Sequence, residues 1–182
     1  HWGCKMTRIA SYRVQLRDGM DFGTLEHRLP QIAGLGVSHL YLSPILTAAP
    51  GSTHGYDVTD PTEIDPALGG LSAFESLARA ADGLGLKIIL DIVPNHMAFG
   101  LETPWLRDVL AKGERSPHAP VFEIDWSAGP LALPWLTAPL PEMAQSGDVR
   151  IEGETLKVGE LAVPLSPGSA TEFDEDNIDL LH

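Results

Sequence analysis

The sequence predicts an α/β fold built on a parallel sheet, and three observations support this prediction. Apolar segments typical of strands occur at three places, residues 11–16, 37–45 and 86–96. Between them lie two stretches in which apolar residues recur at helical spacing. Strands and helices therefore alternate along the chain, and this order favours parallel pairing through right-handed crossovers. The first half of the chain is predicted to be β-α-β-α-β.

The first helix is predicted within DFGTLEHRLPQIAGLG, directly after the strand SYRVQL. Its residues Leu25, Leu29 and Ile32 repeat at helical spacing. Gly34 is a typical residue at which a helix ends. Pro30 weakens the prediction, because a proline inside a helix removes a backbone hydrogen bond.

A long loop is predicted after the second strand, extending to residue 70. The second helix is predicted to start at Ser72, where Glu75 three residues later completes a capping box. It is predicted to end at Gly83. The third strand, 86–96, is apolar almost throughout, which is typical of a strand covered on both faces.

Composition divides the chain into two predicted domains, residues 1–97 and 98–182. Residues 114–170 are rich in proline and glycine. Such a stretch contains few uninterrupted helical or strand patterns. We therefore expect an irregular subdomain after the third strand.

Two elements are nevertheless predicted in this second part. Thr103 and Pro104 are typical of a helix N-cap followed by proline at the first helical position. The one hairpin expected here pairs Val149–Ile151 with Thr155–Val158 and turns at Gly153.

The charge of the chain is strongly acidic. Its 182 residues include 12 Lys+Arg and 25 Asp+Glu, a formal net charge of −13. Nucleic acids and anionic membranes favour clusters of lysine and arginine, so neither is an expected partner. Cys4 is the single cysteine, which excludes an intrachain disulfide and fits a reducing, cytoplasmic location. We expect no membrane-spanning segment.

Polar side chains follow the second and third predicted strands. In parallel α/β folds the carboxyl ends of the strands carry the functional residues, and both groups lie there. Planar hydrogen-bonding groups bind sugar hydroxyls, and an aromatic face covers the C–H side of a sugar ring. The sequence therefore indicates a carbohydrate site. Its candidate residues are His54, Tyr56 and Asp57 after the second strand, and Asp91, Asn95 and His96 at the end of the third.

Other interpretations of these residues stay open. GSTHGYDVTD could be a turn-rich loop in which Asp57 only accepts hydrogen bonds from the backbone. Asp91 could be a buried structural acid paired with an arginine. His54, Asp57, Asp91 and His96 could bind a divalent cation, although their spacing matches no tight metal motif.

Three segments resemble one known family. SYRVQL, the run from GVSHLYLSPI to HGYDVTDPTEIDPALGG, and DIVPNHM are similar to the maltooligosyl trehalose synthases, a branch of the α-amylase family of glycoside hydrolases and transglycosylases. DIVPNH resembles a motif of the whole α-amylase family, and the run from SPI to HGYDV points to the trehalose-forming branch. The resemblance extends from about Ile9 to the C-terminus.

The resemblance implies a (β/α)8 barrel, of which residues 1–97 would form the first three βα units. It also implies an isomerase that breaks the reducing-end α-1,4 link of a maltodextrin and rejoins the glucose through an α,α-1,1 link. Tyr56 would then stack on the sugar at the scissile bond, and His96 would bind its hydroxymethyl group. Asp57 would bind outer hydroxyls of the same sugar. Asp91 would pair with an arginine and Asn95 would hold the loop, with no cofactor and no metal implied.

The catalytic carboxylates have no counterpart in this sequence. A retaining glycosidase mechanism needs two carboxyl groups about 5 Å apart. In the family these groups follow later strands of the barrel, and a complete barrel takes about 250 residues. We therefore expect an N-terminal fragment of a longer enzyme, inactive alone.

Two rival functions stay open. An α-amylase-type hydrolase or transferase would use the same motifs. A non-catalytic glycan-binding module would use Tyr56 and His96 as a sugar cradle without any catalytic carboxylate.

Overall fold

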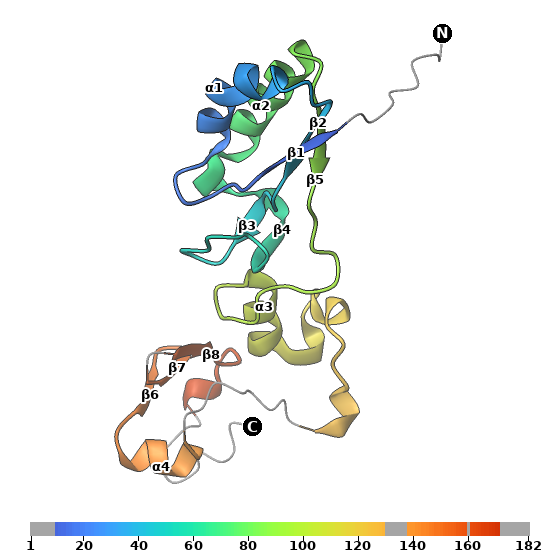
Figure 1. The fold of residues 1–182 in the computed structure, drawn as a ribbon. Helices are drawn as coiled ribbons and strands as arrows, with labels where there is room; N and C mark the ends of the chain where they lie inside the picture. Colours follow the sequence, from blue (N-terminus) through green and yellow to red (C-terminus); the bar gives the residue numbers. More distant parts are fainter. Residues whose placement is uncertain (1–9, 130–137, 160, 172–182) are drawn as a thin grey trace. The chain divides into compact units, whose positions relative to one another are not determined.

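The computed structural model describes residues 10–129, 138–159 and 161–171. It divides into two compact units, His1–Ala98 and Phe99–His182. Figure 1 shows the elements of both units along the chain. Each unit is described by itself below.

The first unit is built on a three-stranded parallel sheet with the order β1-β2-β5. The strands are β1 (Ser11–Val14), β2 (His39–Leu42) and β5 (Lys87–Leu90). Two helices connect them, α1 (Phe22–Ala33) and α2 (Gly70–Gly83). The predicted alternation of strands and helices and the parallel pairing are confirmed.

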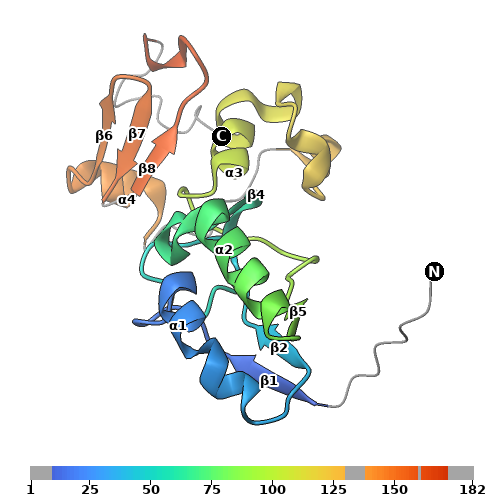
Figure 2. The same cartoon turned by 90° about the horizontal axis from the view of Figure 1, so that it is seen from above.

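Both helices lie on one face of this sheet (Figures 1 and 2). Alternate residues of a strand point to opposite faces, and Val14 and Leu16 direct their side chains toward the helices. The buried core joins residues from the sheet side to residues from the helices: Val14, Leu16, Leu40, Leu42 and Leu86 with Phe22, Leu25, Leu29, Ile32, Leu77 and Ala81. Arg13 precedes Val14 on β1, is exposed, and therefore belongs to the other face of the strand.

Helix α1 forms despite its proline. Asp21 caps its first turn by accepting a hydrogen bond of 2.7 Å from the Thr24 backbone N–H. Pro30 is exposed, and the helix continues through it to Ala33. The burial of Phe22, Leu25, Leu29 and Ile32 stabilises this helix against the loss of one hydrogen bond.

The predicted loop between the second strand and residue 70 is wrong in part. It contains an antiparallel pair, β3 (Leu46–Ala48) with β4 (Val58–Ile64), and a short 3-10 helix, Pro66–Leu68. Proline and glycine recur through this stretch and interrupt the β-branched residues that form the pair.

Helix α2 begins at Gly70, so the predicted start at Ser72 with a capping box is also wrong. The residue before it, Gly69, has φ +104°, and a Cβ added there would lie 2.7 Å from the Ala73 Cβ. Only glycine fits both the backbone conformation and the space. The helix therefore starts from a glycine turn and not from a side-chain cap.

The third strand is shorter than predicted and ends at Leu90, so Asp91 is the first residue after it. The segment from Asp91 to Thr103 is irregular. A backbone hydrogen bond of 2.7 Å from Ala98 N–H to Val58 O holds this segment beside the start of β4.

The second unit contains more regular structure than predicted. The predicted helix and hairpin are confirmed, and Gly153 turns the hairpin with φ +62°. A further strand, β8, pairs with β7 and completes a three-stranded antiparallel sheet. Its helices and strands are α3 (Pro104–Lys112), α4 (Leu140–Gln145), β6 (Val149–Glu152), β7 (Thr155–Val158) and β8 (Leu161–Pro164). Four 3-10 helices lie at Gly113–Arg115, Ala119–Val121, Trp126–Ala128 and Ser169–Thr171.

In the ranges that the structure describes, every helix is too short or too polar to cross a membrane.

Candidate functional site

Three side chains meet where the parallel strands end. Arg13 comes from β1, Asp91 follows β5, and Tyr56 lies in the turn between β3 and β4. The Asp91 backbone N–H donates to Leu42 O at 2.9 Å, so the strand pairing extends to this residue and fixes its position.

Arg13, Tyr56 and Asp91 form a closed hydrogen-bonded group. The Arg13 guanidinium donates from Nη1 to Asp91 Oδ2 at 3.0 Å and from Nη2 to the Tyr56 hydroxyl at 2.8 Å. The Tyr56 hydroxyl donates to Asp91 Oδ2 at 2.5 Å. Arg13 also lies over the ring of Tyr41, 4.5 Å from its centroid. The Tyr56 hydroxyl thus both accepts and donates a hydrogen bond within the group, and its ring is the part available to a ligand.

Asp91 is not the fully buried acid that one interpretation of the sequence predicts. Its side chain is 17% exposed and that of Arg13 is 38% exposed. The expected pairing of Asp91 with an arginine is present, and the arginine is Arg13. The pair therefore lies at the surface of an open site and not in the core.

The hydrogen bonds of this group shift the pKa values of Asp91 and Tyr56 in opposite directions. The hydrogen bond from Tyr56, followed by that from Arg13, lowers the pKa of Asp91 below its ordinary value. The hydrogen bond to Asp91 raises the pKa of Tyr56. Both shifts favour one arrangement near neutral pH, an ionised carboxylate that accepts from a protonated phenol.

This arrangement predicts an acid-dependent loss of stability. Because the pKa of Asp91 is lower in the folded chain than in the unfolded chain, ionised Asp91 stabilises the fold. This contribution is complete above the unfolded pKa of about 3.9. The contribution is lost as pH falls through the lower pKa of the folded state. Urea unfolding of the chain and of Asp91→Asn should therefore differ most near neutral pH and converge in acid. A difference that stays constant from about pH 7 to about pH 2 would contradict this assignment.

His54 and Tyr56 lie side by side in the β3–β4 turn. Their rings stack with centroids 5.9 Å apart and an interplanar angle of 25°. His54 Nδ1 accepts a hydrogen bond of 3.0 Å from the Tyr56 backbone N–H, so Nε2 carries the proton of the neutral ring. The Asp57 carboxylate lies 3.7 Å from the same Nδ1. Because that nitrogen is an acceptor, the contact is not an ion pair of the neutral ring.

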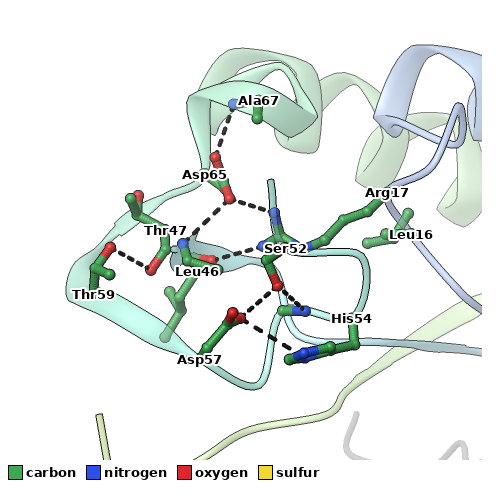
Figure 3. Close-up of polar contacts among 12 residues, drawn as sticks. Leu16, Arg17, Leu46, Thr47, Ser52, His54, Asp57, Thr59, Asp65 and Ala67 are labelled. Atoms are coloured by element: carbon green, nitrogen blue, oxygen red, sulfur yellow. Dashed lines mark hydrogen bonds and ion pairs between the residues drawn. The ribbon is translucent and has the colours of Figure 1, made fainter. Parts of the chain in front are cut away.

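Asp57 stabilises the β3–β4 turn through hydrogen bonds within it (Figure 3). The Ser52 hydroxyl donates to Asp57 Oδ1 and accepts from the Gly55 backbone N–H at 3.0 Å. This agrees with the interpretation of Asp57 as a turn residue. Its side chain is still 32% exposed, so the carboxylate also remains accessible.

A buried ion pair lies next to this turn (Figure 3). Arg17 Nη1 donates to Asp65 Oδ2 at 2.6 Å, and the two side chains are only 6% and 7% exposed. Arg17 Nη2 donates to Leu46 O at 3.1 Å. Asp65 also accepts from the backbone N–H groups of Ala48 and Ala67 at 3.3 and 2.8 Å. The pair therefore connects the end of β1, the β3–β4 pair and the 3-10 helix that follows it.

Asn95 and His96 are exposed and lie in the irregular segment after β5. The hydrogen bond from Ala98 to Val58 holds this segment beside the one that carries Tyr56 and Asp57. The structure thus brings together the chain segments of all six candidate residues. It shows a direct contact with another candidate for His54, Tyr56, Asp57 and Asp91.

The alternative of a metal site finds no support in the described part of the chain. No group of three or more His, Cys, Asp or Glu side chains there could hold an ion. His54, Asp57, Asp91 and His96 are all within that part.

Arg13 and Arg17 are functional candidates that the strand-end rule does not identify. They belong to the first strand segment, RVQLR, in which polar residues alternate with Val14 and Leu16. That alternation is the signal that could have found Arg13, because it places Arg13 on the strand face opposite Val14. It does not locate Arg17, which lies beyond β1 with φ +81° and a buried side chain.

Comparisons with known proteins agree with this geometry. The model of the family described as Alpha amylase, catalytic domain, matches residues 13–124. A putative maltooligosyl trehalose synthase of Mycobacterium tuberculosis (strain ATCC 25618 / H37Rv) is 45% identical over 171 residues, covering 88% of this chain and 22% of that protein.

Solved structures give the same picture. Maltooligosyltrehalose synthase from Arthrobacter ramosus superposes with a TM-score of 0.78 at 37% identity, covering 87% of this chain and 21% of that one. A protein described as DSM5389 glycosyltrehalose synthase superposes with a TM-score of 0.83 at 35% identity, covering 95% and 25%. The resemblance to these synthases is confirmed, and the chain spans about a fifth to a quarter of the relatives' length.

The matched range 13–124 extends from Arg13 through Tyr56 to Asp91 and beyond, and it covers more than half of the chain. On this ground the chain belongs to the α-amylase family, and its matched part to the catalytic domain of that family.

Proposed function

We propose that this chain supplies part of the sugar-binding site of a maltooligosyl trehalose synthase. In this proposal residues 1–97 form the first three βα units of a (β/α)8 barrel, and residues 98–182 form a subdomain inserted after the third strand. The reaction is an intramolecular transfer that converts the reducing-end α-1,4 link of a maltodextrin into an α,α-1,1 link. A cytoplasmic location is part of the same proposal.

The observation that carries the proposal is the way Tyr56 is held. Its hydroxyl is bonded to both Arg13 and Asp91, and the residue is still 37% exposed. A phenol fixed at its polar end presents a rigid aromatic face, which suits the C–H face of a glucosyl ring. A ring held this way loses little conformational entropy when a sugar binds.

The neighbouring residues complete a surface for one glucosyl unit. The His54 ring stacks with that of Tyr56, and its Nε2 proton is available to a hydroxyl group. His96, Asn95 and the accessible carboxylate of Asp57 supply further hydrogen-bonding groups from the adjoining segments. All of these groups suit a neutral, hydroxyl-rich ligand.

Asp91 has a supporting role in this proposal and not the role of nucleophile. Its carboxylate accepts from both Arg13 and Tyr56, and both bonds stabilise the charge. A carboxylate with a lowered pKa and two bonded donors is a weak nucleophile and a poor proton donor. The proposal therefore assigns the nucleophile and the acid/base to other parts of the catalytic domain.

A segment exchange tests the reaction class. The matching segment of the Arthrobacter ramosus synthase is replaced by this chain, and the chimera is incubated with maltopentaose. We expect reducing ends to disappear without a matching release of glucose, since the new link has no free reducing end. A net gain of reducing ends would instead indicate an α-amylase-type hydrolase. A folded chimera that binds maltopentaose without turnover would favour a glycan-binding module.

A further inference from the structure

Residues of β1 and of the segment directly after it support the turn that carries Tyr56. Arg13, Gln15 and Arg17 alternate with the core residues Val14 and Leu16. Each of the three polar residues contacts the segment 53–56. Arg13 donates to the Tyr56 hydroxyl at 2.8 Å, and Gln15 Nε2 lies 3.4 Å from Thr53 O. Arg17 packs against Gly55.

The contact between Arg17 and Gly55 leaves no room for a side chain. A Cβ added to Gly55 would lie 2.7 Å from Arg17 Nε, 3.1 Å from Arg17 Nη2 and 3.0 Å from Pro44 O. Gly55 is buried, whereas His54 and Tyr56 on either side of it are exposed. The turn therefore packs against the Arg17 guanidinium at Gly55, and the rings of His54 and Tyr56 are exposed.

Arg17 is itself held firmly. Its guanidinium donates to Asp65 at 2.6 Å and to Leu46 O at 3.1 Å. Its backbone has φ +81°, an unfavourable conformation for a residue with a side chain. Strain of this kind persists only where the surrounding structure requires it.

The Nε atom of Arg17 has no hydrogen-bond partner among the described residues, although it is buried. It is also the atom nearest to the position of a Gly55 Cβ. A buried donor without a partner needs a physical explanation. We connect it with the close approach of Gly55, where a Cβ would lie 2.7 Å from this atom.

We propose that Arg17 is a positioning residue for substrate. By packing against Gly55 it fixes the position of the turn, and with it the position of the Tyr56 ring at the sugar site. The proposal rests on the function proposed above. A displacement of the turn would move the Tyr56 hydroxyl away from Arg13 and Asp91, which it contacts at 2.8 and 2.5 Å. A displacement of about 1 Å in a substrate-positioning group can cost about a hundredfold in rate.

The chain offers a matched pair of glycines for the test. Gly51 and Gly55 lie in the same turn, and both have φ +79°. Alanine at either position pays the same conformational cost, but no atom lies within 4 Å of a Cβ at Gly51. The difference between Gly51→Ala and Gly55→Ala therefore isolates the contact with Arg17 and Pro44.

The first measurement uses the 182-residue chain labelled with ¹³Cζ-tyrosine. The Tyr56 resonance, assigned with Tyr56→Phe, is followed through an alkaline titration. In the wild type and in Gly51→Ala we expect Tyr56 to titrate above the ordinary value of about 10. In Gly55→Ala its pKa should fall toward that value, because the phenol no longer reaches Asp91. An unchanged titration in folded Gly55→Ala would overturn the proposal.

Arg17→Lys keeps the test decisive if Gly55→Ala does not fold. Lysine retains a positive charge beside Asp65 but loses the planar group beneath Gly55. It should shift the Tyr56 titration in the same direction, while a purely structural role would lower only the melting temperature. A wild-type titration of Tyr56 in Arg17→Lys would overturn the proposal whatever the glycine variants do.

The chimera described above gives the functional readout. Gly55→Ala should lower kcat by at least about tenfold, and Gly51→Ala should stay within about twofold of the parent. If the parent chimera has no synthase activity, the proposed function fails, and the Tyr56 titration still decides the role of Arg17.

Discussion

Asp65→Ala should lower the free energy of unfolding of the chain by about 3–5 kcal/mol. The substitution leaves the Arg17 guanidinium buried, with a side chain only 6% exposed and no opposite charge beside it. It also removes the acceptor of the Ala48 and Ala67 backbone N–H groups. Equilibrium unfolding in urea measures the loss.

An exposed ion pair in the same unit provides the control. Lys87 and Asp82 are paired, but their side chains are 43% and 69% exposed. Asp82→Ala should leave the free energy of unfolding nearly unchanged, because solvent screens an exposed ion pair. Replacing both members of the buried pair, as Arg17→Met with Asp65→Leu, should recover part of the loss because no uncompensated charge remains. Equal losses for Asp65→Ala and Asp82→Ala would contradict the assignment of the buried pair.

Tyr56→Ala in the chimera should lower kcat for maltopentaose by about a hundredfold, with a smaller change in KM. The ring that positions the glucosyl unit is lost, and contacts that strengthen in the transition state affect mainly the rate. Steady-state kinetics with maltopentaose measure the effect.

Tyr56→Phe separates the ring from its anchoring bonds. It keeps the aromatic face but breaks the bonds to Arg13 and Asp91, so we expect an intermediate loss of about tenfold. Tyr12→Phe is the control, because Tyr12 is an exposed tyrosine on the same strand as Arg13. An unchanged kcat for Tyr56→Ala would remove Tyr56 from the site.

The sequence predicts the parallel sheet and the location of the site for one physical reason. Buried strands need apolar residues along their length, and polar residues reappear only where such strands end. Asp91 directly follows β5, Tyr56 lies in the β3–β4 turn, and the Tyr56 hydroxyl lies 2.5 Å from Asp91 Oδ2. Strand-end position therefore predicts Asp91, and the prediction of Tyr56 rests on the polar loop after the second strand; their role in a sugar site stays a prediction.

The partners of these residues depend on contacts distant in sequence. Arg13 lies 78 positions before Asp91, and Arg17 lies 48 positions before Asp65. No local pattern specifies which arginine meets which carboxylate. For Arg13 the register between strands decides it, because Arg13, Tyr41 and Ile89 are lateral neighbours in the sheet.

The β3–β4 pair escapes prediction for a different reason. Its register shifts twice within three residues of β3, and Pro61 lies within β4. Such strands lack the regular alternation that identifies a strand from sequence. The Arg17–Asp65 pair, which is not visible locally, helps to hold this irregular pair against the sheet.

Hydrogen–deuterium exchange of the chimera with and without maltooligosaccharide tests the central claim most directly. Sugar seated on Tyr56 should slow exchange in the peptides that cover residues 51–60 and 91–97, and leave the β6–β7 hairpin unchanged. Protection elsewhere in the chimera, with no change in these two segments, would contradict the claim that Tyr56, Asp91 and their neighbours form the sugar site.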